Sequence, residues 1–112
     1  MGGAAANHRN VISGNDQDGV QLRGNSTSSN KISGNYIGLS ADGESALGNS
    51  WDGVKIYEEA SNNTIGGSSP GEGNVISGNI WSGVSIYGAG TNVNFVAGNF
   101  IGTDKDLSLI HI

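Results

Sequence analysis

The chain has 112 residues, a formal net charge of −5, 20 glycines, no cysteine and a 35% share of hydrophobic residues. This length allows a single domain. Five lysines and arginines leave no basic patch for phosphates, which excludes nucleic acid as a partner. The missing cysteines exclude a disulfide framework and a zinc–thiolate site. No apolar run is long enough for membrane insertion, and we expect no metal and no cofactor.

The predicted elements are short strands that recur in a fixed order along the chain. In chain order, Asn-x-Ile occurs at 10–12, Gly-Val-x-aliphatic at 19–22 and Asn-x-aliphatic-x-Gly at 30–34. The same three motifs return in the same order at 35–37, 53–56 and 63–67, and again at 74–76, 83–86 and 94–98, where Val96 is the aliphatic residue. A last Asn-x-Ile, ending in Ile101, lies at 99–101. Apolar and polar residues alternate in these stretches, which is the strand period of two. No segment shows a sustained helical period, so the sequence predicts an all-β fold.

Two inserts interrupt this rhythm. The spacing from Ile12 to Val20 is 8 residues, but from Ile37 to Val54 it is 17, and the added residues form the loop LSADGESALGNS at 39–50. A second insert, SSPGEG, lies at 68–73. Because inserts in repeat proteins map to loops on the surface, we expect these segments to be the variable loops.

A longer repeat contains the shorter one. The sequence NVISGN at 10–15 returns 64 residues later at 74–79, and residues 1–106 hold about one and two-thirds copies of a 64-residue unit. Three short strands per turn in a constant order predict a parallel β-helix of about three coils, a fragment of a longer solenoid. Residues 107–112 match no repeat position. The side chains expected to fill the core are Val20, Leu22, Ile32, Ile37, Val54, Ile56, Ile65, Ile76, Val84, Ile86, Val96 and Ile101, together with Ile12 in the third row.

The asparagines and glycines between strands receive a structural interpretation. Both residue types tolerate the left-handed conformation that a sharp corner needs, and stacked asparagine amides can hydrogen-bond from coil to coil. We favour this role over ligand binding. The residues expected to form the turns and ladders are Asn10, Asn30, Gly34, Asn35, Asn63, Asn74, Asn94, Gly98 and Asn99.

The motifs NVISGN, GNYIG, ALGN, NNTIGG and GVxI, in this order, resemble the right-handed parallel β-helix repeats of large bacterial surface and secreted proteins. More distantly, the plan of the coil resembles pectate lyases. The resemblance implies a right-handed coil and an extracellular or cell-surface setting. The end of the chain, LSLIHI at 107–112, resembles an adaptor-derived tail, so we expect a truncated environmental sequence with a foreign end. Uncapped coils also lead us to expect end-to-end self-association.

Candidates for catalysis lie on the first sheet, formed by the Gly-Val-x-aliphatic strands. Pectate-lyase-like chemistry needs a base, usually an arginine, and Arg23 is the lone candidate. Glycoside hydrolysis needs paired carboxylates, and Asp18 and Asp52 would lie in adjacent coils. Acids before a turn are more often turn formers than catalysts. The alternative function is therefore that the chain forms part of a polysaccharide lyase or glycoside hydrolase of the pectate-lyase-like class.

Aromatic residues repeat in register beside the same sheet. Trp51 and Trp81 precede its strands, and Tyr57 and Tyr87 follow them. Aromatic rings flanked by polar groups suit sugar rings, although stacked rings can also serve the packing of the coil alone. The favoured function is a non-catalytic structural solenoid segment with a carbohydrate-contacting face, whose partner is a polysaccharide or glycan.

Overall fold

The computed structural model describes residues 1–102, which form short strands and one turn of 3-10 helix. The tail at 107–112 lies outside the described residues. The elements, in order, are η1 (Ala6–His8), β1 (Val11–Ile12), β2 (Val20–Arg23), β3 (Lys31–Ile32), β4 (Tyr36–Ile37), β5 (Val54–Tyr57), β6 (Thr64–Gly66), β7 (Val75–Ile76), β8 (Val84–Ile86), β9 (Phe95–Ala97) and β10 (Phe100–Ile101).

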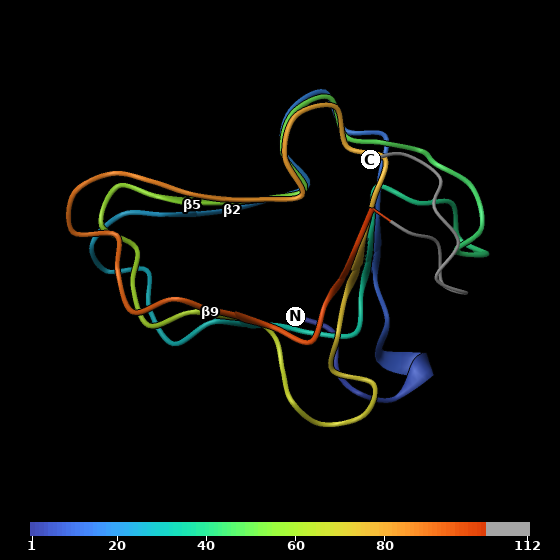
Figure 1. Ribbon diagram of the computed structural model, residues 1–112, viewed down its shortest axis with the longest axis horizontal. Helices are drawn as coiled ribbons and strands as arrows, with labels where there is room; N and C mark the ends of the chain where they lie inside the picture. The colour runs from blue at the N-terminus through green and yellow to red at the C-terminus, as the bar shows by residue number, and fades with distance from the viewer. Residues whose placement is uncertain (103–112) are drawn as a thin grey trace.

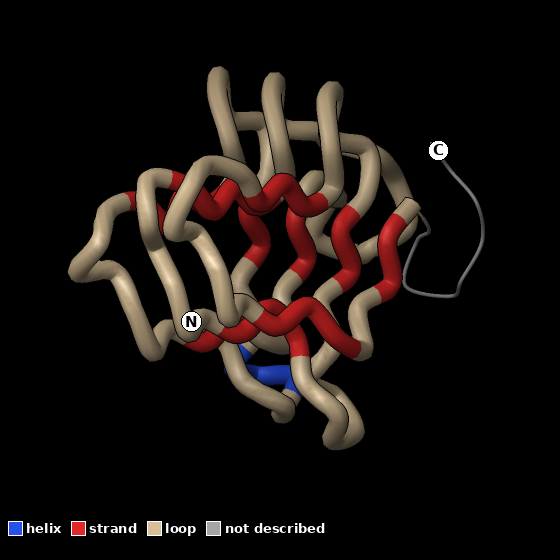
Figure 2. Tube along the Cα trace, turned by 60° about the vertical axis from the view of Figure 1, so that its left-hand side comes forward, coloured by secondary structure: helices blue, strands red, loops and turns tan. Residues whose placement is uncertain are grey.

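The strands form three parallel sheets with the orders β1-β4-β7-β10, β2-β5-β8 and β3-β6-β9. Every third strand therefore enters the same sheet. Viewed along the stack, successive coils follow nearly the same path (Figure 1). Figure 2 shows the coils side by side, with the strands of each sheet in a row. The all-β parallel β-helix with three strands per coil and about three coils is confirmed.

The register between strands stacks like residues on like residues. Leu22 pairs with Ile56, and Ile56 pairs with Ile86, along the first sheet. In the sheet β3-β6-β9 the row is Ile32, Ile65 and Val96, and in the sheet β1-β4-β7-β10 it is Ile12, Ile37, Ile76 and Ile101. The three predicted rows are confirmed. Each coil presents the same apolar shape to its neighbour, which is why the sequence must repeat.

Burial within these rows depends on the position of the coil. Ile37, Ile56, Ile65 and Ile76 in the middle coils are completely buried. Leu22 and Val84 are partly buried against them. The prediction of a core position is wrong for Ile86, Val96 and Ile101, which are 40%, 41% and 50% exposed. They belong to the last described coil, and within residues 1–102 no further coil covers them.

The long insert folds back over the outer side of the sheet β1-β4-β7-β10. Leu39 forms an antiparallel bridge with Ala46 and is fully buried. With Tyr36 and Val75, it makes a second, small apolar cluster. Tyr36 and Val75 occupy outward positions of their strands, so the loop gives cover to residues that solvent would otherwise reach. The Arg9 guanidinium lies 4.2 Å from the centre of the Tyr36 ring.

Candidate functional site

The outer side of the sheet β2-β5-β8 carries most of the residues that the sequence singled out. Gln21, Lys55 and Ser85 form one outward row because their strands pair in register. Arg23 pairs with Tyr57 in the next outward row. Trp51, Lys55, Tyr57, Trp81 and Tyr87 together are called the aromatic face below.

The aromatic rings stack from coil to coil. Trp51 and Trp81 have ring centroids 5.2 Å apart and planes inclined by 6°, and Tyr57 and Tyr87 are 5.6 Å apart at 21°. Stacking covers one face of each ring with its neighbour. The exposed aromatic surface therefore lies mainly on the last described coil, where Trp81 is 61% and Tyr87 is 49% exposed. The structure brings the four residues together as two pairs.

Lys55 lies between the two stacks. Its Nζ atom is 5.7 Å from the ring centre of Trp51, 4.8 Å from that of Tyr57 and 5.5 Å from that of Tyr87, all within the range of cation–π attraction. The same atom lies 4.0 Å from Asp18 Oδ2. The pKa of Lys55 is raised, chiefly by a hydrogen bond with the Tyr87 side chain and then by the charges nearby, Asp18 among them. The ammonium group therefore stays charged and ties the two aromatic stacks together.

Asp18 and Asp52, the candidate carboxylate pair, do lie in adjacent coils, but they face the backbone. Asp18 Oδ1 accepts a hydrogen bond of 2.8 Å from the Asp52 N–H, and Asp52 Oδ1 accepts one of 2.9 Å from the Ser82 N–H. Gln21 Nε2 donates to Asp18 Oδ2 at 2.6 Å. Both acids are buried. They form a ladder that satisfies an N–H of the following coil, a structural role of the kind that N-capping carboxylates have.

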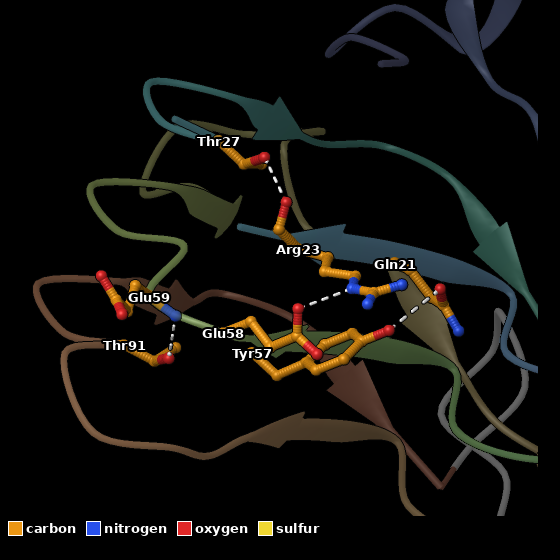
Figure 3. A network of polar contacts seen from close by, with 7 residues as sticks. All are labelled: Gln21, Arg23, Thr27, Tyr57, Glu58, Glu59 and Thr91. Atoms are coloured by element: carbon orange, nitrogen blue, oxygen red, sulfur yellow. Dashed lines mark hydrogen bonds and ion pairs between the residues drawn. The ribbon is translucent and has the colours of Figure 1, made fainter. Parts of the chain in front are cut away.

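Arg23, the candidate base, is held in a polar network at the end of the first sheet (Figure 3). Its Nε donates to Glu58 Oε2 at 2.7 Å, and the guanidinium lies 5.7 Å from the centre of the Tyr57 ring. The Glu58 carboxylate raises the pKa of Arg23, first through this hydrogen bond and then through its charge. A guanidinium so paired keeps its proton, which is the opposite of what a general base requires.

A shallow groove of about 600 Å³ runs beside the tyrosine stack. Two glycines widen it because they carry no side chain, and two glutamates lie at its rim. Its lining residues are Gly24, Asn25, Tyr57, Glu58, Glu59, Tyr87, Gly88 and Ala89. An aromatic wall beside carboxylate and amide groups offers both stacking and hydrogen-bond acceptors to a polar, ring-shaped ligand.

The structure places the predicted asparagines in two ladders. Asn30, Asn63 and Asn94 are joined by Nδ2–Oδ1 hydrogen bonds of 3.0 and 3.2 Å. The second ladder runs through Asn10, Asn35, Asn74 and Asn99, with distances of 3.0, 3.1 and 2.9 Å. Gly34 and Gly98 turn the corners of this second ladder with a φ of +70° each. A Cβ on Gly34 would lie 2.0 Å from the carbonyl oxygen of Gly3, so only glycine fits.

A third ladder was missed by the sequence reasoning. Asn15, Asn49 and Asn79 are joined by Nδ2–Oδ1 hydrogen bonds of 2.8 and 2.7 Å, and Asn49 is fully buried. Each follows a glycine, at 14–15, 48–49 and 78–79. These Gly-Asn pairs precede the first sheet by a constant spacing, and that repeat was the signal available in the sequence. All three corners of the coil therefore use asparagine.

A metal centre and a membrane span were also searched for among residues 1–102. Within residues 1–102, no group of three or more His, Cys, Asp and Glu side chains is placed to hold a metal ion. None of the helical structure in this range is long and apolar enough to cross a membrane. Comparisons of the chain with protein-family models, curated proteins and solved structures found no match.

Proposed function

We propose that the chain is a non-catalytic structural segment of a bacterial cell-surface or secreted protein, wound as a right-handed coil and carrying a carbohydrate-contacting face. The observation that supports this most is the contrast between the two candidate sets. Asp18 and Asp52 bond to the backbone, and Arg23 bonds to Glu58, whereas the aromatic rows repeat from coil to coil on the outer surface.

A polysaccharide is the partner that this surface suits. Sugar rings offer apolar C–H faces and rims of hydroxyl groups, which pack on aromatic rings and hydrogen-bond to adjacent polar groups. Trp81 and Tyr87 supply exposed ring surface, and the groove beside Tyr57 and Tyr87 supplies carboxylates and an amide. Trp81 and Tyr87 flank strand β8, and their stacked partners Trp51 and Tyr57 continue each row into the neighbouring coil, about 4.8 Å away, which fits a chain-like ligand.

The test is a glycan array followed by titration of the best ligand into the protein. We expect binding that is lost when Trp51, Tyr57, Trp81 and Tyr87 are all replaced by alanine. Phe95 and Phe100 are also exposed aromatic residues but lie on the other two sheets, so the F95A/F100A variant is the matched control and should keep binding. Binding that survives the four alanines would remove the proposal, provided that circular dichroism shows both variants folded.

The alternative function, part of a polysaccharide lyase or glycoside hydrolase, is tested separately. The assay follows unsaturated products from polygalacturonate and reducing ends from uncharged glycans. Activity that disappears in Arg23→Ala would establish the enzyme and overturn the non-catalytic proposal.

A further inference from the structure

The cations on the outer side of the first sheet are already engaged. Arg23 is paired with Glu58 at 2.7 Å, and Lys55 lies among three aromatic rings with Asp18 nearby. The Lys55 side chain is only 14% exposed. A carboxylate arriving from solvent would have to compete with partners that are fixed in the fold. The Arg23 side chain is 61% exposed, so an anionic ligand can reach it only in competition with Glu58.

Glu58 holds its position against a backbone preference. Its φ is +53°, in the left-handed region that side chains disfavour. The residues that follow the paired strand positions in the neighbouring coils, Gly24 and Gly88, are glycines with φ values of +99° and +98°. A glutamate at a position where the adjacent coils have glycine adds backbone strain. The ion pair between Glu58 and Arg23 is the interaction that offsets this strain.

The remaining charge around the groove is negative. Glu59 is exposed at its rim and forms no ion pair within residues 1–102, and the whole chain carries a net charge of −5. A polyanion would meet repulsion from this rim and no unpaired cation beneath it. An uncharged sugar meets neither obstacle, because stacking and hydroxyl hydrogen bonds need no counter-ion.

From this arrangement we infer that the aromatic face selects an uncharged polysaccharide and rejects polyuronates. The inference rests on the proposed carbohydrate-contacting function and adds the chemical class of the ligand. It predicts that binding does not depend on salt, since screening weakens only interactions between charges.

The experiment compares two kinds of probe on the same protein. Uncharged β-glucan, mannan and xylan oligosaccharides are titrated beside polygalacturonate oligosaccharides at about 0.02 M and about 0.5 M NaCl. We expect binding of at least one uncharged probe with an affinity that changes by less than about twofold between the two salts, and polygalacturonate binding weaker by about tenfold or more. Tighter, salt-sensitive binding of polygalacturonate would overturn the inference and leave the carbohydrate function standing. Binding of neither class would overturn the carbohydrate function itself and the inference with it.

A charge variant tests the cause. Glu58→Gln removes the partner of Arg23 at an exposed site, so it should raise polygalacturonate binding at low salt by about fivefold to tenfold. Glu72→Gln is the matched control, because it makes the same change in net charge but frees Lys31, which lies in β3 on another sheet. Equal gains in the two variants would show that total charge excludes the polyanion, and would overturn the role assigned to the Arg23–Glu58 pair.

Discussion

Replacing Asn74 by alanine tests how much the asparagine ladders contribute to the fold. The side chain is fully buried in a middle coil. Its Oδ1 accepts hydrogen bonds of 2.9 and 3.1 Å from the N–H and Nδ2 of Asn35, and its Nδ2 donates to Asn99 Oδ1 and to the Ile32 carbonyl, both at 2.9 Å. The alanine removes all four bonds. It leaves the N–H of Asn35, itself fully buried, without an acceptor, while Asn35 Nδ2 keeps only its 3.4 Å hydrogen bond to the Met1 carbonyl.

The expected cost follows from those orphaned groups. A buried donor without a partner costs about 1–3 kcal/mol and a lost hydrogen bond about 1 kcal/mol, so the effects on Asn35 alone imply a loss of about 2–4 kcal/mol in the free energy of unfolding. Asn10 occupies the first position of the same ladder, and its side chain only donates to Asn35 Oδ1. In Asn10→Ala, Asn35 Oδ1 still accepts the hydrogen bond from the backbone N–H of residue 10. Its cost should be near 1 kcal/mol.

Urea unfolding followed by circular dichroism measures the three proteins side by side. Asn92→Ala, an exposed asparagine outside the ladders, is the control and should change the free energy of unfolding by less than about 0.5 kcal/mol. The predicted order of destabilisation is Asn74, then Asn10, then Asn92. An Asn74→Ala protein as stable as Asn92→Ala would refute the claim that the ladder amides stabilise the coils.

Three further predictions concern burial, charge and the exposed apolar residues of the last described coil. Ile56→Asp should destabilise by about 4 kcal/mol or more because it places a charge among fully buried side chains, whereas the same change at half-exposed Ile101 should cost about 1–2 kcal/mol; similar urea midpoints for the two would contradict this. The pKa of Glu72 is lowered, first by the hydrogen bond from Lys31 and then by that from the Ser69 N–H. The ionised Glu72 therefore stabilises the fold above the ordinary glutamate pKa of about 4.3. This stabilisation is lost as the pH falls below that value and through the lowered pKa. Glu72→Gln should therefore show a flatter acid limb in unfolding curves recorded from pH 6 to about pH 3, and an unchanged limb would count against the pair. The exposure of Ile86, Val96 and Ile101 predicts association that increases with concentration in sedimentation velocity, and a strict monomer that unfolds cooperatively at low and high concentration would refute it.

The fold could be predicted from the sequence because each strand repeats a pattern that has one physical meaning. Alternation marks the inward side, and the constant order of Asn10, Gly19 and Asn30 motifs marks which sheet each strand joins. The rows through Ile56 and Ile65 followed from that alone. The third asparagine ladder lay outside the prediction because its members lack the Asn-x-aliphatic pattern of the other two. Two residues after Asn15, Asn49 and Asn79 the chain has glutamine or tryptophan in place of an aliphatic residue.

The side-chain contacts and backbone conformations of the candidate site could not be predicted from the spacing of residues in the sequence. A carboxylate before a strand can face solvent or the next coil, and the hydrogen bond from the Asp52 N–H to Asp18 decides between the two. The left-handed conformation of Glu58 is equally hidden, since glutamate carries no signal for a positive φ. Shared registers predicted the stacking of Trp51 on Trp81 but not that Lys55 would lie between the two stacks.

The most direct test of the account is the register of the stacked coils, on which the ladders and the aromatic face both depend. Thr64 and Phe95 are partners in the sheet β3-β6-β9, and Ala97 lies two residues beyond Phe95 on the same side of its strand. The chain has no cysteine, so paired cysteines can be introduced without interference. Adjacent strands lie about 4.8 Å apart, whereas the diagonal to Ala97 is about 8 Å and beyond the reach of a disulfide. Mass spectrometry after mild oxidation should show an internal disulfide in T64C/F95C and free thiols in T64C/A97C; the reverse result, or equal oxidation of both, would contradict the parallel in-register stack.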